Sequence, residues 1–149
     1  MQLAVDIKIL KPKIIVWKAI TDIANCSDMI SSIIDLEILH LPTGTILGLK
    51  WKETRKMFGK EATEIMWITD FVENEYYCTR AESHGSVYIS KLSLTEIDEN
   101  TILTMSFSAE AQSTFVKIIS AIMSLFLKNV MKKELLKNLV DIKEHLEKT

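Results

Sequence analysis

The chain has 149 residues, and its formal charge of −2 comes from 18 basic and 20 acidic residues. These charges are interspersed, whereas a nucleic-acid surface requires a clustered basic excess, so we expect no nucleic-acid partner. The length suits a single domain over residues 1–149 that buries its own core. The two cysteines, Cys26 and Cys78, form no CxxC pair, which argues against a disulfide framework and predicts two reduced, buried thiols.

The hydrophobic segments predict neither export nor a membrane span. The N-terminal residues lack a basic segment followed by the apolar run of a secretory signal, so we expect a cytoplasmic protein. The most apolar window, residues 115–131, is interrupted by Lys117 and Lys128 and is shorter than the ~20 apolar residues of a transmembrane helix. We therefore expect no integral membrane segment.

The first part of the chain predicts one strand and two short helices. Apolar and polar residues alternate from residue 3 to 9, which is typical of a half-buried strand that we expect to end at Lys11. Pro12 suits the first turn of a helix, and apolar residues follow at helical spacing up to Ile23. The polar segment 25–28 ends this helix and is expected to cap a second short helix over residues 29–34.

The middle of the chain predicts a run of antiparallel strands. Alternation of apolar and polar residues returns at Asp35 and is interrupted only by short turns rich in Gly, Pro, Asn, Asp or Ser. Such short connections join neighbouring antiparallel strands. The expected strands cover residues 35–41, 48–57, 61–72, 76–82, 87–97 and 102–111.

The end of the chain predicts one long helix from residue 115 to 147, with an N-cap supplied by residues 112–114. Between residues 118 and 131 apolar side chains occupy nearly every face, more than contact with one sheet requires. The surplus indicates a cavity, a partner chain or a membrane surface. The apolar residues that recur at steps of three and four are Phe115, Ile118, Ile119, Ile122, Phe126, Val130, Leu136, Leu139, Val140 and Leu146.

This order of elements, a strand, two helices, six strands and a long helix, is typical of the α+β class. A sheet of seven strands curls, and the long helix is the only predicted element able to cover its concave face. We therefore expect a pocket between the curved sheet and the C-terminal helix.

The chain resembles the START-like helix-grip superfamily, also called SRPBCC, and within it the bacterial polyketide cyclase/dehydrase-like proteins. The resemblance implies a curved seven-stranded antiparallel sheet wrapped around the C-terminal helix, with an apolar tunnel between them. It rests on Val5-Asp6-Ile7, Lys11-Pro12-Lys13, Val16-Trp17-Lys18-Ala19-Ile20-Thr21-Asp22, Gly48, Trp51-Lys52-Glu53-Thr54-Arg55, Ile68-Thr69-Asp70-Phe71, Leu136-Lys137-Asn138-Leu139 and Leu146-Glu147.

The same resemblance leaves the activity open. Members of the superfamily bind sterols, phospholipids, plant hormones, quinones or aromatic polyketides, and only some catalyse a reaction. Neither the His and Cys spacing of the iron–sulfur members nor a glycine-rich phosphate loop is present, since residues 45–47 between Gly44 and Gly48 are too apolar for one. We assign no catalytic residue and predict no cofactor.

The strand over residues 48–57 contains the most informative candidates. Alternation places Glu53 and Arg55 on the face that carries Leu49, Trp51 and Met57 and that should point to the core. There they either orient a polar group of a ligand or pair structurally, with each other or with Glu64. Both interpretations are kept.

The other candidates are large side chains that line a pocket in one interpretation and pack an ordinary core in the other. Trp51 and Tyr88 combine a broad ring with one polar atom, and methionine adapts to ligands of varied shape. The predicted ligand-binding residues are Trp51, Glu53, Arg55, Tyr88, Met105, Phe107, Phe115, Ile119, Met123 and Phe126. The three histidines, His40, His84 and His145, are scattered, so we predict no metal site.

We predict a protein that binds or transports a hydrophobic or amphipathic small molecule, such as a lipid, quinone or polycyclic compound, in this cavity. One alternative is a polyketide cyclase- or dehydratase-like enzyme, in which Glu53 serves as acid or base and Arg55 or Tyr88 stabilises an enolate. The other is an interaction module, in which the apolar segment 118–131 forms a homodimer or docks on a client protein.

Overall fold

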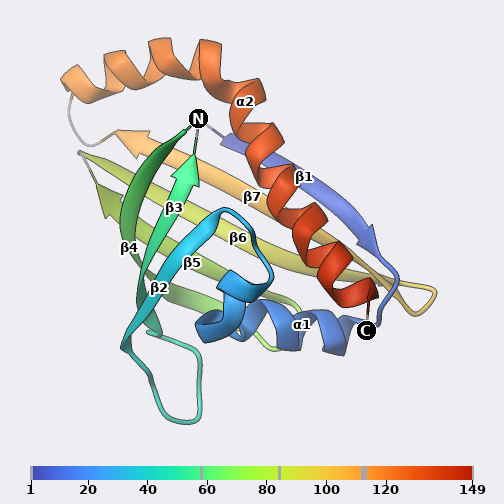
Figure 1. Ribbon diagram of the computed structural model, residues 1–149. Helices are drawn as coiled ribbons and strands as arrows, with labels where there is room; N and C mark the ends of the chain where they lie inside the picture. The colour runs from blue at the N-terminus through green and yellow to red at the C-terminus, as the bar shows by residue number, and fades with distance from the viewer. Residues whose placement is uncertain (1, 58, 84, 112–113, 149) are drawn as a thin grey trace.

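The structure is a computed structural model that describes residues 2–57, 59–83, 85–111 and 114–148, except for the side chains of Met57 and of residues 111–127. Strands and helices follow one another in the predicted order (Figure 1). They are β1 (Gln2–Ile9), α1 (Lys13–Thr21), the 3-10 helix η1 (Ile23–Asp28), β2 (Ile33–His40), β3 (Lys50–Met57), β4 (Lys60–Val72), β5 (Tyr76–Ser83), β6 (Ser86–Ile97), β7 (Asn100–Ala111) and α2 (Thr114–Glu147).

The strands form one antiparallel seven-stranded sheet in the order β1-β7-β6-β5-β4-β3-β2. Strands β2 to β7 are a meander, and β1 completes the sheet by pairing with β7. The pairing shifts register twice between β2 and β3 and once between β4 and β5, and such irregularities bend a sheet. Figure 1 shows the resulting curl, with α2 lying across the concave side. The predicted α+β helix-grip architecture is confirmed.

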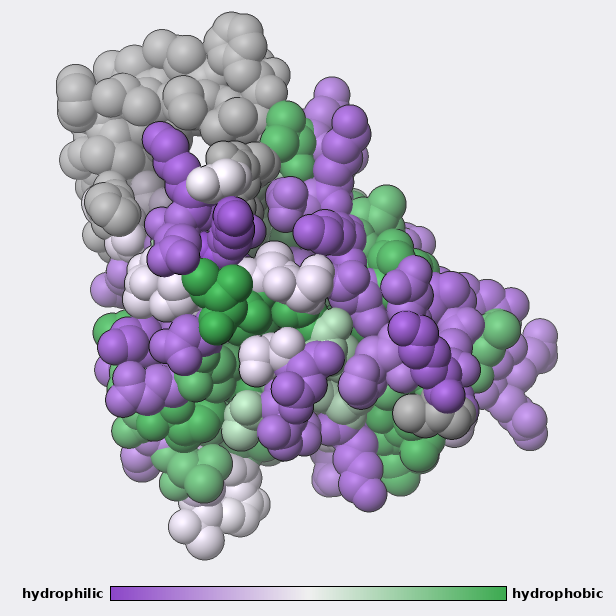
Figure 2. Space-filling view, in the orientation of Figure 1, coloured by the Kyte–Doolittle hydropathy of each residue, from purple (hydrophilic) through white to green (hydrophobic). Residues whose placement is uncertain are grey.

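The C-terminal half of α2 packs on the sheet through a narrow apolar stripe of Leu135, Leu139, Ile142 and Leu146, all buried. Their spacing of three and four residues keeps them on one face of the helix. Two other residues of the apolar pattern lie outside this stripe, since Val130 is 37% and Leu136 42% exposed. Leu136 is one residue, about 100°, beyond the buried stripe, so its side chain points away from the sheet. In Figure 2 hydrophilic side chains cover the outer face of this half of the helix.

The second short helix lies earlier than expected. The segment 29–34 was predicted to be helical, but η1 occupies Ile23–Asp28 and Ile33 already belongs to β2. In a 3-10 helix residues three apart share a face, and here Ile23 and Cys26 are both buried. The amide groups of Met29 and Ile30 then donate to the carbonyl of Cys26, at 3.0 and 2.8 Å, and close the turn before β2.

Two smaller expectations are also corrected. The first strand ends at Ile9 and not at Lys11, whose carbonyl accepts a hydrogen bond from Thr101 Oγ1 at 2.8 Å in the turn that follows. Cys26 is buried as predicted, but Cys78 is only partly buried.

Helix α1 and η1 lie at the end of the sheet where α2 terminates (Figure 1). Val16, Trp17 and Ile20 of α1 join the core formed by the sheet and α2. Tyr77 of β5 fixes the helix twice, because its ring meets Trp17 edge-on at 6.1 Å and its hydroxyl donates to the Ile20 carbonyl at 3.1 Å. Among the helical residues whose side chains are described, none form a segment long and apolar enough to cross a membrane.

Two neighbouring leucine positions of α2 test the packing. Leu139 is fully buried, so Leu139→Ala should lower the free energy of unfolding by about 3 kcal/mol, through lost apolar burial and the cavity that remains. Leu136→Ala removes the same atoms from an exposed site and should change stability by less than about 1 kcal/mol. Urea unfolding followed by circular dichroism measures both, and equal losses would contradict the observed orientation of α2.

Candidate functional site

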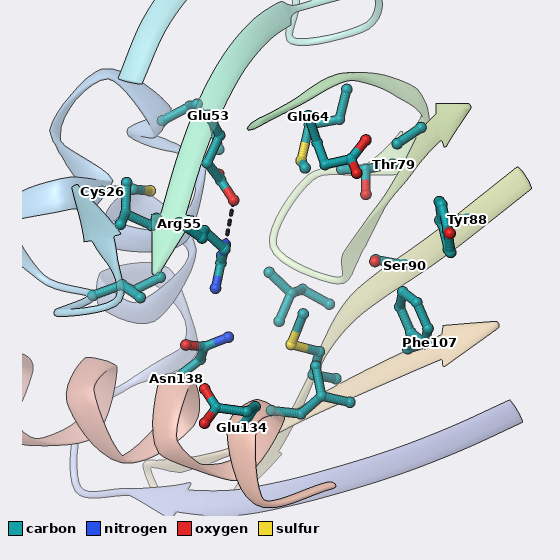
Figure 3. A pocket seen from close by; sticks show the side chains of 18 of the residues that line it. Cys26, Glu53, Arg55, Glu64, Thr79, Tyr88, Ser90, Phe107, Glu134 and Asn138 are labelled. Atoms are coloured by element: carbon teal, nitrogen blue, oxygen red, sulfur yellow. Dashed lines mark hydrogen bonds and ion pairs between the residues drawn. The ribbon is translucent and has the colours of Figure 1, made fainter. Parts of the chain in front are cut away.

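A cavity of about 290 Å³ lies between the concave face of the sheet and the C-terminal half of α2 (Figure 3). Most of its wall is apolar, as in small-molecule sites generally. The lining residues come from η1 and the turn after it, from β2 to β7 and from α2. They are Ile23, Cys26, Ile30, Ile33, Trp51, Glu53, Arg55, Ala62, Glu64, Met66, Tyr77, Thr79, Ala81, Tyr88, Ser90, Leu92, Met105, Phe107, Met131, Glu134, Leu135, Asn138 and Ile142.

Strand β3 supplies the charged part of the wall. Trp51, Glu53 and Arg55 lie on its concave face, because successive residues of a strand alternate between faces. Trp51 and Glu53 are buried, whereas the Arg55 side chain is 23% exposed. The prediction that Glu53 and Arg55 point to the core side of this strand is therefore confirmed.

Glu53 is held by both of its carboxylate oxygens. Trp51 Nε1 donates to Oε1 at 3.1 Å, and Arg55 Nε donates to Oε2 in an ion pair. A buried carboxylate without such partners would cost several kcal/mol, so these contacts make burial of the charge tolerable. The structural interpretation is confirmed, because Glu53 and Arg55 pair with each other. Both residues also line the cavity, and their part in orienting a ligand stays a prediction.

The polar contacts continue from Arg55 to α2. Arg55 Nη1 donates to Ser32 Oγ at 3.3 Å, and Ser32 Oγ donates to Asn138 Oδ1 at 3.2 Å. Ser32 and Asn138 are both buried. We call Trp51, Glu53, Arg55, Ser32 and Asn138 the polar network. It connects β3, the segment before β2 and α2 along one side of the cavity (Figure 3).

The opposite side of the cavity is flat and mainly apolar. Tyr88 of β6 and Phe107 of β7 stack with ring centroids 5.9 Å apart and an interplanar angle of 21°. Ser90 and Thr79, which pair across β5 and β6, place small side chains beside these rings. Figure 3 shows this aromatic wall facing the polar network across the cavity.

The structure brings together six of the predicted site residues at the cavity: Trp51, Glu53, Arg55, Tyr88, Met105 and Phe107. Their part in binding stays a prediction. The other four, Phe115, Ile119, Met123 and Phe126, lie outside the described side chains.

Sequence reasoning missed several polar lining residues, and one of them had a usable signal. Asn138 interrupts the apolar stripe of α2 between Leu135 and Leu139, where a polar residue requires a reason. Glu64, which the sequence offered only as a structural partner of Glu53 and Arg55, lines the cavity and faces Glu53 directly across the β3–β4 hairpin. Cys26, Thr79 and Glu134 carried no comparable signal.

Cys26 and Tyr77 line the cavity in their neutral forms. Burial, and then the negative charges of Glu53 and Asp22, raise the pKa of the Cys26 thiol to about 12, although Arg55 partly offsets them. Burial also raises the pKa of the Tyr77 phenol well above its ordinary range. A thiol that stays protonated at neutral pH is a poor nucleophile, so Cys26 contributes apolar surface. Among the described residues, no group of three or more His, Cys, Asp or Glu side chains could hold a metal ion.

No protein-family model matches this sequence, and no curated protein matches it significantly. Solved structures match nearly the whole chain. A Thermus thermophilus protein, TTHA0849, aligns with a TM-score of 0.80 at 11% identity, covering 98% of this chain and 97% of its own. A START superfamily protein from Mycobacterium smegmatis gives 0.78 at 14% identity, covering 97% and 98%. The Zhui aromatase/cyclase from Streptomyces sp. R1128 gives 0.75 at 13% identity, covering 99% and 93%.

These likenesses establish the fold. The chain has the START-like helix-grip fold shared by the START superfamily protein and the aromatase/cyclase, as the sequence resemblance implied. At 11–14% identity they carry no residue-level assignment of activity.

The ion pair in the cavity wall should matter for stability. Arg55→Met leaves the buried Glu53 carboxylate without its cation, so we expect a loss of about 2–3 kcal/mol in the free energy of unfolding. The double variant Glu53→Gln/Arg55→Met removes both charges and should recover part of this loss. Urea unfolding measures each variant.

Arg80 and Glu82 provide a matched control, because they form a pair of the same type and spacing on the exposed surface of β5. Arg80→Met should cost less than about 1 kcal/mol. If Arg55→Met costs no more than Arg80→Met, the Glu53–Arg55 pair is not a buried one.

The raised pKa of Cys26 predicts a pH dependence. The unfolded chain releases the thiol proton near the ordinary value of 9.0, whereas the folded protein holds it to about 12. This contribution to stability is complete below pH 9 and falls above it, by up to about 1.4 kcal/mol per pH unit. Between pH 8 and pH 10 the free energy of unfolding should therefore fall by about 1.4 kcal/mol less in Cys26→Ala than in the wild type. Ser27→Ala, an exposed neighbour, should follow the wild type, and three parallel pH profiles would refute the assignment.

Proposed function

We propose that this protein binds and carries a hydrophobic or amphipathic small molecule, of the lipid, quinone or polycyclic type, in the cavity between the sheet and α2. The observation that supports it is the cavity itself, about 290 Å³ with a mainly apolar wall and few, clustered polar groups. The proposed contacts are Trp51, Tyr88, Met105 and Phe107 on the described wall. Glu53 and Arg55 orient the ligand, and Phe115, Ile119, Met123 and Phe126 remain proposed contacts from α2.

Burial of apolar surface accounts for the affinity. At roughly 25 cal/mol per Å², covering a few hundred Å² of ligand supplies several kcal/mol. After the entropic cost of association this corresponds to about micromolar binding. Most of that free energy is non-directional, so orientation depends on the few polar atoms of the wall.

The contacts of Glu53 favour a carrier over an enzyme. Both Glu53 oxygens accept hydrogen bonds within the wall, from Trp51 and Arg55, and the Arg55 cation balances the carboxylate, so its described contacts are accounted for by a structural role. The second candidate, a cyclase- or dehydratase-like activity, is favoured by the structural likeness to the Zhui aromatase/cyclase. In a carrier Glu53→Gln retains ligand binding, whereas in such an enzyme it abolishes turnover.

The proposed setting is the cytoplasm, and the two free cysteines support a reducing compartment. No nucleic-acid partner is proposed. Homodimer formation through the segment 118–131 is the remaining alternative, and the mass of the native particle distinguishes it from a monomeric carrier.

Native mass spectrometry of the purified protein, followed by denaturing extraction, tests the proposal. We expect a stoichiometric apolar compound bound to the protein, or micromolar binding of the uncharged fluorophore 1-N-phenylnaphthylamine after extraction. A protein that is both empty and unable to bind this fluorophore would reject the carrier function. An empty dimer would favour the interaction module.

Filling the cavity should abolish binding. Ala81 is buried in the wall, so Ala81→Phe places a ring in the space that the ligand needs and should weaken binding of 1-N-phenylnaphthylamine at least about tenfold. Ala24→Phe makes the same substitution at an exposed position of η1 and should leave binding unchanged. Unaltered binding by folded Ala81→Phe would place the ligand elsewhere.

A further inference from the structure

The polar network leaves an unused hydrogen-bond donor in the cavity wall. Asn138 is only 5% exposed, and its Oδ1 accepts from Ser32. No hydrogen bond among the described residues uses its Nδ2 group. Figure 3 shows this nitrogen on the cavity side of the side chain. Because Nδ2 is not among the buried, unpaired side-chain atoms of the described residues, it is open to the cavity, where a ligand acceptor can reach it.

Arg55 adds a second donor at the same place. Its guanidinium group has five N–H bonds, of which Nε serves Glu53 and Nη1 serves Ser32. Among the described residues no hydrogen bond uses Nη2. The Arg55 and Asn138 side chains approach the same end of the cavity from β3 and from α2 (Figure 3). This end therefore offers two donors to a ligand, whereas each Glu53 oxygen already accepts one hydrogen bond.

The charges of the described wall disfavour an anionic ligand group. Apart from Glu64, the charged residues of the described wall are Glu53, Glu134 and Arg55. The Arg55 charge is already balanced by Glu53. A ligand carboxylate would lose its hydration and meet a net negative wall, whereas an uncharged oxygen would accept the two donors at little electrostatic cost.

The aromatic wall of Tyr88 and Phe107 favours a ligand with a planar ring system. Tyr88 and Phe107 present stacked rings, and the small Ser90 and Thr79 side chains leave room in front of them. A planar ring system packs on such a surface with broad contact and little loss of conformational entropy. Its oxygen would then reach the polar network on the other side.

We propose that the ligand is an uncharged ring compound whose carbonyl oxygen accepts hydrogen bonds from Asn138 Nδ2 and Arg55 Nη2. This inference rests on the proposed function and narrows it from hydrophobic molecules in general to ring ketones and related neutral carbonyl compounds. Fatty acids and other carboxylates are excluded by it.

Three naphthalenes of similar size test the inference by displacement of 1-N-phenylnaphthylamine. 2-Acetylnaphthalene carries the carbonyl, 2-ethylnaphthalene has the same shape without an acceptor, and 2-naphthoate is an anion. We expect the ketone to bind about tenfold more tightly than either of the others, because only it satisfies the donors without adding charge.

Variants of Asn138 test whether this residue causes the preference for the ketone over the hydrocarbon. Asn138→Leu removes the donor at nearly constant volume, and Asn138→Asp replaces Nδ2 by an oxygen while keeping an acceptor for Ser32. In either variant the tenfold preference for the ketone over the hydrocarbon should fall to about twofold. Asn129→Leu, the same substitution at an exposed position of α2, should retain it. Thermal melting checks folding, and the Asp variant serves if the Leu variant does not fold.

The outcomes separate this inference from the proposed function. Equal binding of ketone and hydrocarbon, tighter binding of naphthoate, or a preference that survives both Asn138 variants would overturn the inference and leave the carrier function intact. Failure of 1-N-phenylnaphthylamine and all three naphthalenes to bind would overturn both.

Discussion

Burial of the Glu53 carboxylate is the constraint on which the site depends. A charge on the concave face of a sheet is tolerated only with partners, and here Trp51 and Arg55 occupy both oxygens. Arg55 in turn contacts Ser32, which reaches Asn138 on α2. Three separate elements are thus positioned around one acid. A wholly apolar wall would pack at least as tightly, but it would not fix where a polar ligand atom can lie.

The polar network is matched by direct anchoring of α2 over the sheet. Leu139 and its neighbours on the stripe bury one face of the helix, and Asp141 accepts hydrogen bonds from the amide and hydroxyl of Ser31, at 3.0 and 2.8 Å. Lys143 donates to the carbonyl of Lys8 in β1 at 2.7 Å. These contacts hold the C-terminal half of α2 to the η1–β2 segment on one side and to β1 on the other. The roof of the cavity is therefore fixed at this end by packing and by hydrogen bonds together.

The sequence predicted the sheet well because alternation and short turns are local signals. The face of β3 that carries Trp51, Glu53 and Arg55 followed from alternation alone. Contacts between distant segments were not predictable in this way. Nothing near Ser32 in the chain indicates its link to Asn138, 106 residues away, and the choice of Leu135 over Leu136 for the buried stripe depends on how α2 is rotated against the sheet. The second short helix was likewise predicted at residues 29–34 but lies at Ile23–Asp28, because its position depends on where the chain turns to bury Ile23.

The cavity exists because the middle of the sheet carries small side chains. Thr79 and Ser90 face each other across β5 and β6, and Ala81 lies two residues further along β5, while larger residues such as Ile68 and Phe107 flank them in the same row. Valine or leucine at these positions would bury more apolar surface and close the space, which would raise stability by the usual measure of core packing. A sheet that forgoes this packing where the polar network faces an aromatic wall gives up stability there, which supports the proposed binding of a ligand. If the proposed function holds, stability and binding are opposed at the same few residues, since side chains large enough to improve the packing would fill the space of the ligand.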